Sequence, residues 1–184
     1  MKNLLRTGLF AILISSGFAL AEVTDADSGG FTTVNEVVID ASRDAVWTAA
    51  IDEIGLWWSS DHTVSGDARR LGITPVLQGC FCERFESGGG VVHLTVTMVN
   101  PGVVIRLTGG LGPLGLMGVN GNMTWEFEGV EGGTRVTFTY AVGGYREDGL
   151  DTIAVPVDYV IGEALGRLRA HVETGDASNA VVEP

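Results

Sequence analysis

The sequence predicts an α+β fold in which an antiparallel sheet holds one long C-terminal helix. Between Pro156 and Glu173, apolar residues recur at steps of three and four, which is the spacing of one helix face. Between residues 31 and 142, most segments alternate apolar and polar residues and are separated by turn residues, which is typical of antiparallel strands. An apolar helix stripe and an apolar sheet face both need cover, so we expect the helix to lie on the sheet.

The predicted C-terminal helix begins at Pro156, because proline is tolerated in a first turn, and ends before Gly175. Glu163 and Arg167 are four residues apart on its polar side, and we expect them to pair. Residues 175–184 have no periodicity and are predicted to be a disordered tail. The apolar stripe consists of Val157, Val160, Ile161, Ala164, Leu165, Leu168 and Val172.

The N-terminus has the pattern of a secretory signal peptide. Lys2 and Arg6 precede an apolar run over residues 9–18, and residues 19–21 read Ala-Leu-Ala, an A-x-A cleavage signal. The run is shorter than the roughly 20 residues that cross a bilayer, which disfavours a membrane anchor. We therefore expect cleavage after Ala21, export to the periplasm or the medium, a linker over residues 22–30 and one domain over residues 31–174.

The charge of the chain excludes several classes of function. Removing residues 1–21 takes away Lys2 and Arg6 and no acidic residue, so the formal net charge moves from −12 to −14. Such a chain repels nucleic-acid phosphates and anionic lipid headgroups. Lys2 is the only lysine, so the mature chain has no lysine for a Schiff base or a phosphate-binding P-loop. We expect no nucleic-acid partner, and no membrane span once the signal is removed.

The region between the signal peptide and the final helix divides into strands and two short helices. Ser42 precedes one short helix as a candidate N-cap, and residues 54–58, with the pair Trp57-Trp58, form a second. Alternation in the strands predicts an inward, apolar face and an outward, polar face; His93 falls on the outward face. The predicted strands are residues 31–39, 69–73, 80–85, 91–99, 103–108, 122–128 and 134–142. The inward face includes Val92, Leu94, Val96, Met98, Met123, Trp125, Phe127, Val136, Phe138 and Tyr140.

Cys80 and Cys82 are the only cysteines, and an exported protein meets an oxidising compartment. Two residues apart on a regular strand, they share a face with Cα atoms about 6.5–7 Å apart, at the edge of disulfide geometry. Two small apolar side chains are the favoured interpretation, and a disulfide or a redox-active or metal-binding Cys-x-Cys is the alternative. The three histidines are scattered, so we expect no metal site and no cofactor.

The segment from Gly109 to Gly121 is rich in glycine and apolar residues. Its G-x-G-x-x-G match over residues 110–115 is not a dinucleotide site, because no helix follows and Pro113 interrupts the turn. Two interpretations are open. The segment is a mobile loop that presents Leu111, Leu114, Leu116 and Met117 at the lip of an apolar pocket, or it is folded down as part of the core.

Several short strings, in this order, resemble a known superfamily. They are Val46-Trp47, Trp57-Trp58, the string from Gly79 to Glu83, Gly112-Pro113-Leu114, the string from Gly133 to Val136, and Arg167-Leu168. Over residues 31–173 the chain resembles the SRPBCC, or START-like helix-grip, superfamily, in the group of Hsp90-ATPase-activator-like and polyketide-cyclase-like proteins. The resemblance implies a curved sheet of about seven strands round the last helix, with two short helices after the first strand. It also implies an elongated cavity between sheet and helix that binds lipids, polyketides or other apolar molecules.

Within that fold, Glu83 is the candidate polar group of the site, because it lies between Phe81 and Phe85 on the inward face. A carboxylate among aromatic rings is either a polar anchor or acid/base group, or one half of a structural ion pair. Tyr140 and Tyr159 offer hydroxyls to a ligand, although a buried tyrosine bonded to backbone is as common. The remaining predicted ligand-lining residues are Trp58, Leu114, Met117, Met123, Trp125 and Phe127.

We therefore expect an exported, non-catalytic carrier of a small apolar molecule. The alternative is a cyclase- or hydrolase-like enzyme in which Glu83 and a tyrosine transfer protons. Export argues against an Hsp90 partner role, which requires the cytosol, and it also weakens the enzyme interpretation. A third possibility is a domain with a filled core that binds a protein partner; a large cavity would favour the first two interpretations and a collapsed one the third.

Overall fold

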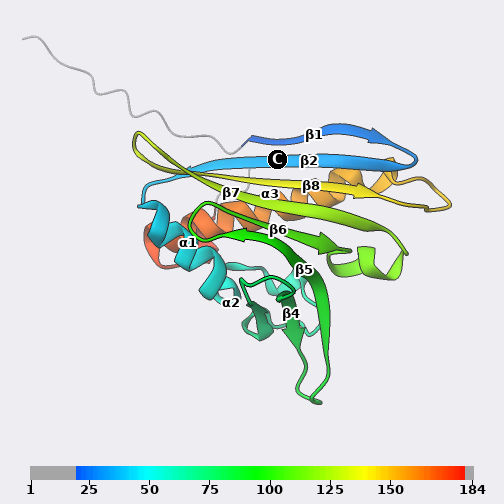
Figure 1. Ribbon diagram of the computed structural model, residues 1–184, viewed down its shortest axis with the longest axis horizontal. Helices are drawn as coiled ribbons and strands as arrows, with labels where there is room; N and C mark the ends of the chain where they lie inside the picture. The colour runs from blue at the N-terminus through cyan, green and yellow to red at the C-terminus, as the bar shows by residue number, and fades with distance from the viewer. Residues whose placement is uncertain (1–19, 181–184) are drawn as a thin grey trace, which may run out of the picture.

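The computed structural model describes residues 20–180, and they form a curved antiparallel sheet of eight strands around a long helix (Figure 1). The strand order is β1-β2-β8-β7-β6-β5-β4-β3. The strands are β1 Leu20–Asp27, β2 Gly30–Ile39, β3 Leu71–Ile73, β4 Cys80–Arg84, β5 Gly90–Asn100, β6 Val104–Gly109, β7 Asn120–Val130 and β8 Gly133–Gly143. The helices are α1 Arg43–Asp52, α2 Ile54–Trp57 and α3 Asp151–Thr174, with short 3-10 turns η1 Ser60–His62, η2 Ala68–Arg70, η3 Gly112–Leu116 and η4 Ala177–Asn179. This confirms the predicted α+β helix-grip fold.

The eighth strand, β1, occupies the segment predicted to be a linker. Its residues pair antiparallel with β2, from Leu20 opposite Glu36 to Asp27 opposite Gly30. The linker prediction for residues 22–30 is therefore wrong. The acidic, small-residue composition is not typical of a strand, but this segment forms one by pairing with the edge of β2. Acidic side chains on an edge strand also discourage pairing with another chain. Of the predicted signal peptide, only Leu20 and Ala21 belong to the described residues.

Helix α3 is longer than predicted and begins at Asp151 rather than at Pro156. Pro156 therefore lies inside the helix, where its missing N–H leaves one helical hydrogen bond unmade near the N-terminal end. The predicted end is confirmed: Gly175 caps the helix in the left-handed conformation, with φ 77°, and its N–H donates to the carbonyl of His171.

The predicted disordered tail is wrong for the residues that the structure describes. Residues 177–179 form η4, and Ala177 is buried as part of the core. The predicted Glu163–Arg167 pair is also not formed. Glu163 instead contacts His62, and the Arg167 Nε–H donates to the carbonyl of Trp57 at 2.8 Å. Both side chains thus connect α3 to the segment that contains α2 and η1.

The core lies between the concave face of the sheet and α3, with α1 and α2 closing one end (Figure 1). Alternate residues of β2, β7 and β8 point into it, and from α3 it receives Ile161, Leu165 and Leu168. Burying a large apolar side chain of this kind contributes about 1.5–3 kcal/mol. Among residues 20–180, no helix is both long enough and apolar enough to cross a bilayer.

Strand β5 interrupts the predicted alternation at two β-bulges. Against β4, Phe81 pairs with Leu94 and Cys82 with Val92, so one residue of β5, His93, has no partner. A second shift, between Val96 and Met98, occurs against β6. Each bulge inserts one residue and changes which face the following residues occupy. Leu94 and Val96 are buried as predicted, but Val92 and Met98 are 58% and 41% exposed, and His93 is only 5% exposed.

The turn between β7 and β8 depends on a glycine. Gly133 has φ 142°, and a Cβ atom on it would lie 2.1 Å from the carbonyl oxygen of Ile39. Gly133→Ala is expected to lower the free energy of unfolding by about 3 kcal/mol, because backbone strain and steric overlap add. Urea denaturation checks this value.

The matched control is Gly129→Ala in the same hairpin, because a Cβ atom there would meet no atom within 4 Å. It should change stability by no more than about 0.5 kcal/mol. Equal effects of the two substitutions would contradict the proposed role of Gly133.

Candidate functional site

The structure places most of the predicted ligand-lining residues in the core. Phe85 follows the end of β4 and is half-buried. Tyr159, which the sequence places beside the apolar stripe of the helix, is 53% exposed, and Met117 is 37% exposed. The ligand-binding roles of all these residues stay predictions. Those with 4% exposure or less are Trp58, Phe81, Glu83, Leu114, Met123, Trp125, Phe127 and Tyr140.

Phe81 is the centre of a group of aromatic rings on the concave face. Its ring lies 5.4 Å from that of Trp58, 5.6 Å from that of His93 and 6.5 Å from that of Trp125, centroid to centroid. Trp125 in turn stacks on Phe138 at 4.4 Å. Edge-to-face and stacked ring pairs at these distances contribute about 0.5–1.5 kcal/mol beyond the burial of their area. The predicted lining residues therefore pack against one another.

Two hollows lie elsewhere on the molecule, and no residue of α3 lines either of them. The larger, about 880 Å³, is formed by β1, β2, β7 and β8, from Asp25 to Thr32 and around Asn122 and Ala141. The smaller, about 660 Å³, is formed by β3, β4 and the start of β5 and contains Cys80 and Cys82. An elongated cavity was predicted between the sheet and the helix. At the aromatic group the interior is instead packed.

Glu83 lies at the end of β4 and accepts hydrogen bonds from three directions. The N–H groups of Val64 (2.9 Å) and Ser65 donate to its two carboxylate oxygens, and His93 Nε2 lies 3.0 Å from Oε2. The side chains of Glu83 and His93 are 0% and 4% exposed. His93 was predicted to face outward, and that prediction is wrong, because the β5 bulge turns His93 inward.

The pKa of Glu83 reflects two opposing effects. Burial raises the pKa of this carboxyl, but hydrogen bonds from Ser65, Val64 and His93 outweigh it, so the pKa lies below the ordinary glutamate value. The ionised carboxylate is therefore stabilised in the folded chain. It contributes stability above the unfolded pKa of about 4.3, and that contribution is lost as the pH falls through the lower folded pKa.

Each of the three histidines of the sequence lies against a glutamate from another element. His62 Nε2 is 2.8 Å from Glu163, and His171 Nε2 is 2.6 Å from Glu53. These two pairs join α3 to η1 and to the end of α1. The pair of His93 and Glu83 differs from them because it is fully enclosed.

The Tyr140 side chain forms hydrogen bonds with backbone groups of the Gly109–Gly121 segment. Its hydroxyl donates to the carbonyl of Gly109 (2.9 Å) and accepts from the N–H of Leu111 (3.0 Å). Burial raises the pKa of this phenol to about 12. The hydroxyl is thus occupied by the loop rather than free for a ligand. The loop itself combines both earlier interpretations: Leu114 is buried, whereas Leu116 is 92% exposed.

Four buried polar atoms on the concave side have no hydrogen-bond partner among the described residues. They are Thr33 Oγ1, Asn35 Oδ1, His93 Nδ1 and Trp125 Nε1. The amide nitrogen of Asn35 does donate to Asp158 of α3 at 2.9 Å, and burial raises the pKa of that carboxyl. Buried polar atoms are nearly always satisfied by protein, water or a ligand, so each of these four atoms has hydrogen-bonding capacity left over.

Sequence reasoning missed Thr33, Asn35 and Asp158. A signal for the first two was present, because both alternate with Phe31 and Val37 on the buried face of the first strand. Asp158 could not be found this way, because the stripe pattern assigns it to the solvent side of the helix. Among residues 20–180, no three histidine, cysteine or acidic side chains are grouped as metal ligands would be.

Comparison with known proteins agrees with this architecture. Residues 31–173 match the family described as polyketide cyclase / dehydrase and lipid transport. The chain belongs to this family. The match covers every strand of the sheet except β1 and nearly all of α3. No protein with a curated description matches the chain.

Solved structures show the same fold at low sequence identity. A conserved protein of unknown function from Enterococcus faecalis, EF2215, has 14% identity and a TM-score of 0.60, covering 90% of this chain and 82% of its own. DynU16, a putative protein of the dynemicin biosynthetic locus, has 18% identity and a TM-score of 0.58 over 83% of this chain and 49% of its own. CalU16 from Micromonospora echinospora has 14% identity and a TM-score of 0.52 over 88% and 86%. At such identities the likeness establishes the fold alone.

Replacing the buried carboxylate tests the role of Glu83. Glu83→Gln is expected to lower the free energy of unfolding by about 2–4 kcal/mol at pH 7, because the charge that three donors face is lost. The difference from the parent chain should begin to shrink as the pH falls below the unfolded pKa of about 4.3, and it should disappear once the pH has passed the lower folded pKa, where the parent carboxylate is itself protonated. Urea denaturation at several pH values measures both effects.

Glu86→Gln is the matched control, because the side chain of Glu86 is 84% exposed and forms a surface ion pair with Arg70. An exposed pair contributes little, so this variant should follow the parent at every pH. If Glu83→Gln lowered the free energy of unfolding by the same amount at every pH, the site would require the shape of the side chain and not its charge.

Removing the Tyr140 hydroxyl tests the attachment of the loop. Tyr140→Phe should lower the free energy of unfolding by about 1–2 kcal/mol, since the Leu111 N–H and the Gly109 carbonyl lose their partner. Amide hydrogen exchange should become faster at Leu111 than in the parent chain. Tyr145→Phe, at a position that is 80% exposed, should change neither quantity. Unchanged exchange at Leu111 in the first variant would contradict the attachment.

Proposed function

We propose that this protein is an exported, non-catalytic binding protein for a small, mainly apolar molecule that carries at least one polar group. The observation that carries the proposal is the set of four unpartnered polar atoms within an apolar, aromatic interior. Small-molecule sites in proteins combine apolar walls with a few placed polar groups, and this set has that character. Membership of a family described by polyketide cyclisation and lipid transport supports the same chemistry.

The polar atoms divide into two groups that suit different parts of one molecule. His93 Nδ1 and Trp125 Nε1 belong to rings that both contact Phe81. Thr33 Oγ1 and Asn35 Oδ1 lie on β2 under α3, and Asn35 also contacts Asp158. Trp125 stacks on Phe138, which is the β8 residue opposite Asn35, so the two groups are neighbours across the sheet. An elongated apolar molecule with a hydroxyl or carbonyl group would satisfy them.

Entry to this interior requires movement, because the aromatic group is closely packed. The part of the molecule suited to such movement is the end of the sheet that carries the β1–β2 turn, the η3 segment and the connection from β8 to α3 (Figure 1). There the N–H of Leu150 donates to the carbonyl of Ser28 at 3.1 Å, and Asn120 of β7 pairs with Gly143 of β8. Leu116, at 92%, is largely exposed at this end. Apolar residues on such connections suit the entrance of a ligand site.

Export is supported by two independent features. The first is the basic, apolar and A-x-A pattern of residues 1–21. The second is the disulfide between Cys80 and Cys82, since such bonds persist in oxidising compartments. Cleavage after Ala21 would leave β1 beginning at Glu22, which pairs with Val34. Most of the β1–β2 pairing would therefore remain in the mature chain.

A second candidate function rests on the enclosed pair of His93 and Glu83. A carboxylate that orients one nitrogen of an imidazole leaves the other nitrogen able to exchange a proton with a bound molecule. His93 Nδ1 is buried and unpartnered, which favours this enzyme interpretation over one that uses Tyr140. Glu83 would then position His93 rather than act as the acid or base itself.

The test is native mass spectrometry of the protein recovered from its own periplasm or medium, followed by denaturation. We expect a chain that begins at Glu22 and a bound apolar molecule that is released on unfolding. Thr33→Val should retain that molecule about tenfold less well, the loss of one hydrogen bond, without lowering the stability of the empty chain. Thr32→Val, on the opposite face of β2, is the matched control.

Two results would contradict the proposal. One is a chain that carries no molecule and also fails to bind the hydrophobic dye anilinonaphthalene sulfonate, which would favour a filled core with a protein partner. The other is an uncleaved chain recovered only from the cytosol. Chemical change of the bound molecule by the parent chain, abolished in His93→Gln, would instead establish the enzyme interpretation.

A further inference from the structure

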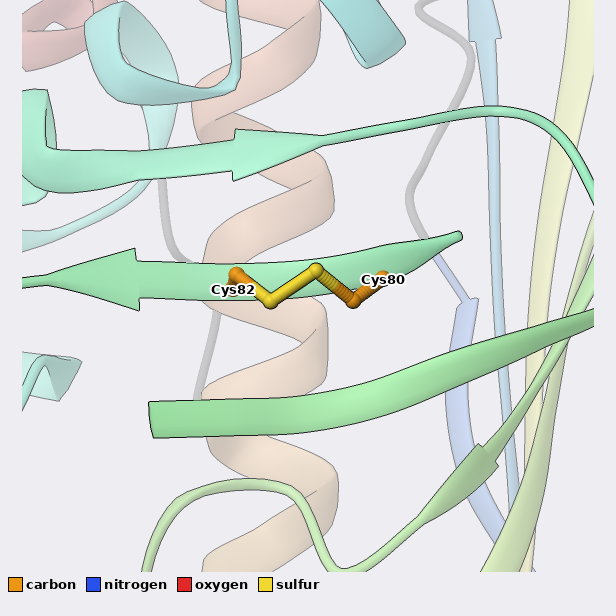
Figure 2. Close-up of a disulfide and its surroundings, with 2 residues drawn as sticks. All are labelled: Cys80 and Cys82. Carbon is orange, nitrogen blue, oxygen red and sulfur yellow. A yellow bond between two sulfur atoms is a disulfide. The ribbon is translucent and has the colours of Figure 1, made fainter. Parts of the chain in front are cut away.

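Cys80 and Cys82 form a disulfide along a single strand on the outer side of the sheet. Figure 2 shows the bridge lying along β4, with α3 passing behind the strand. The two cysteines are half-buried and alternate with Phe81 and Glu83, which are buried on the inner side. The sequence left open whether the two cysteines are bonded and favoured two separate apolar side chains. The structure shows that they are bonded, so the favoured interpretation is wrong.

This disulfide cannot serve the usual purpose of connecting distant parts of a chain. Its cysteines are two positions apart, so the loop that it closes is among the shortest possible. A cross-link stabilises a fold mainly by restricting the unfolded chain, and this effect decreases as the loop shortens. The role of the bond is therefore local to β4.

The local effect is a shortened strand. The Cα atoms of Cys80 and Cys82 are 5.4 Å apart, whereas two residues of a regular strand span about 6.5–7 Å. The shift in the β4–β5 register occurs between Phe81 and Cys82, inside the span that the disulfide closes. The extra residue of β5 at this shift is His93. The contracted part of β4 thus lies opposite the bulge.

The bulge connects the outer and inner faces of the sheet at this point. It turns His93 inward, where Nε2 contacts Glu83, the residue that follows Cys82. Glu83 also accepts hydrogen bonds from the N–H groups of Val64 and Ser65, in the segment between η1 and η2. A change in the length of β4 between the cysteines would therefore act directly on the enclosed pair of His93 and Glu83.

The surroundings of the disulfide suit reaction with an external thiol. It lines an open hollow of about 660 Å³ together with Arg69, Arg70 and Arg84. Asp67 and Glu86 pair with the first two of these arginines, whereas Arg84 forms no ion pair within residues 20–180. Nearby guanidinium groups stabilise the thiolate that leaves when a disulfide is attacked.

We propose that Cys80–Cys82 is a thiol–disulfide exchange site whose redox state sets the position of His93 against Glu83. A thiolate of an external dithiol protein attacks one sulfur, forms a mixed disulfide and releases the other cysteine as a thiolate. The second thiol of the dithiol then attacks the mixed disulfide and releases the second cysteine. The dithiol loses two electrons and two protons to become a disulfide, and the cysteine pair gains them as two thiols. Reduction lets β4 extend, and His93 leaves Glu83.

The test uses the folded full chain with histidine rings labelled with ¹³C and dithiothreitol as the dithiol. At neutral pH without denaturant, two thiols should become reactive to iodoacetamide, as counted by mass. The ring cross-peak of His93 should move, while those of His62 and His171 stay, because these lie on other elements. Removing dithiothreitol and adding oxidised glutathione should restore the original spectrum. The variants His62→Gln and His171→Gln assign the three cross-peaks.

A double variant, Cys80→Ser with Cys82→Ser, should show the moved His93 cross-peak without any reductant. Three results would overturn the inference. The first is thiols that react only after urea is added. The second is complete reduction with the His93 cross-peak unchanged. The third is loss of all three folded cross-peaks together on reduction, which would make the bond a simple requirement for folding. None of these readouts depends on the presence of a bound molecule.

Discussion

The whole structure depends on covering the apolar concave face of one curved sheet. Residues of β2, β7 and β8 present this face as a continuous surface, and α3 lies along it with Ile161, Leu165 and Leu168. A sheet of this size cannot bury both faces on itself, so removal of the helix would expose most of the core to water. The helices α1 and α2 then close one end, the pair of His171 with Glu53 joins the end of α1 to α3, and the pair of His62 with Glu163 joins η1 to α3.

Within that covered interior, polar groups concentrate at two places. At the first, Glu83 receives the N–H groups of a neighbouring segment and the imidazole of His93, so an ionised carboxylate remains stable without contact with water. At the second, Asn35 of β2 and Asp158 of α3 meet across the interface between sheet and helix. Both places combine satisfied and unpartnered polar atoms, and the proposed binding function rests on the unpartnered ones.

The packed aromatic group and the binding role proposed for this family member are compatible if the interior is adjustable. The segment with η3 is attached through backbone groups to Tyr140 and buries Leu114, yet it leaves Leu116 in water. The segment is thus anchored to the core at Leu114 and Val119 and exposed to solvent at Leu116. The bulged strand β5 offers a second adjustable point, because its register against β4 changes at the disulfide.

The sequence by itself determined the class of fold, the C-terminal helix and its stop at Gly175, and the inward residues of β7 and β8. These features follow from local periodicity and turn chemistry, which a single chain segment contains in full. Family strings and Glu83 as an inward polar group were also predictable. Only the tertiary structure decided that residues 20–27 form a strand, because an acidic edge strand exists only against a neighbour. It likewise decided the disulfide and the place of His93, since a bulge arises from the register of two strands and leaves no trace in the alternation of one.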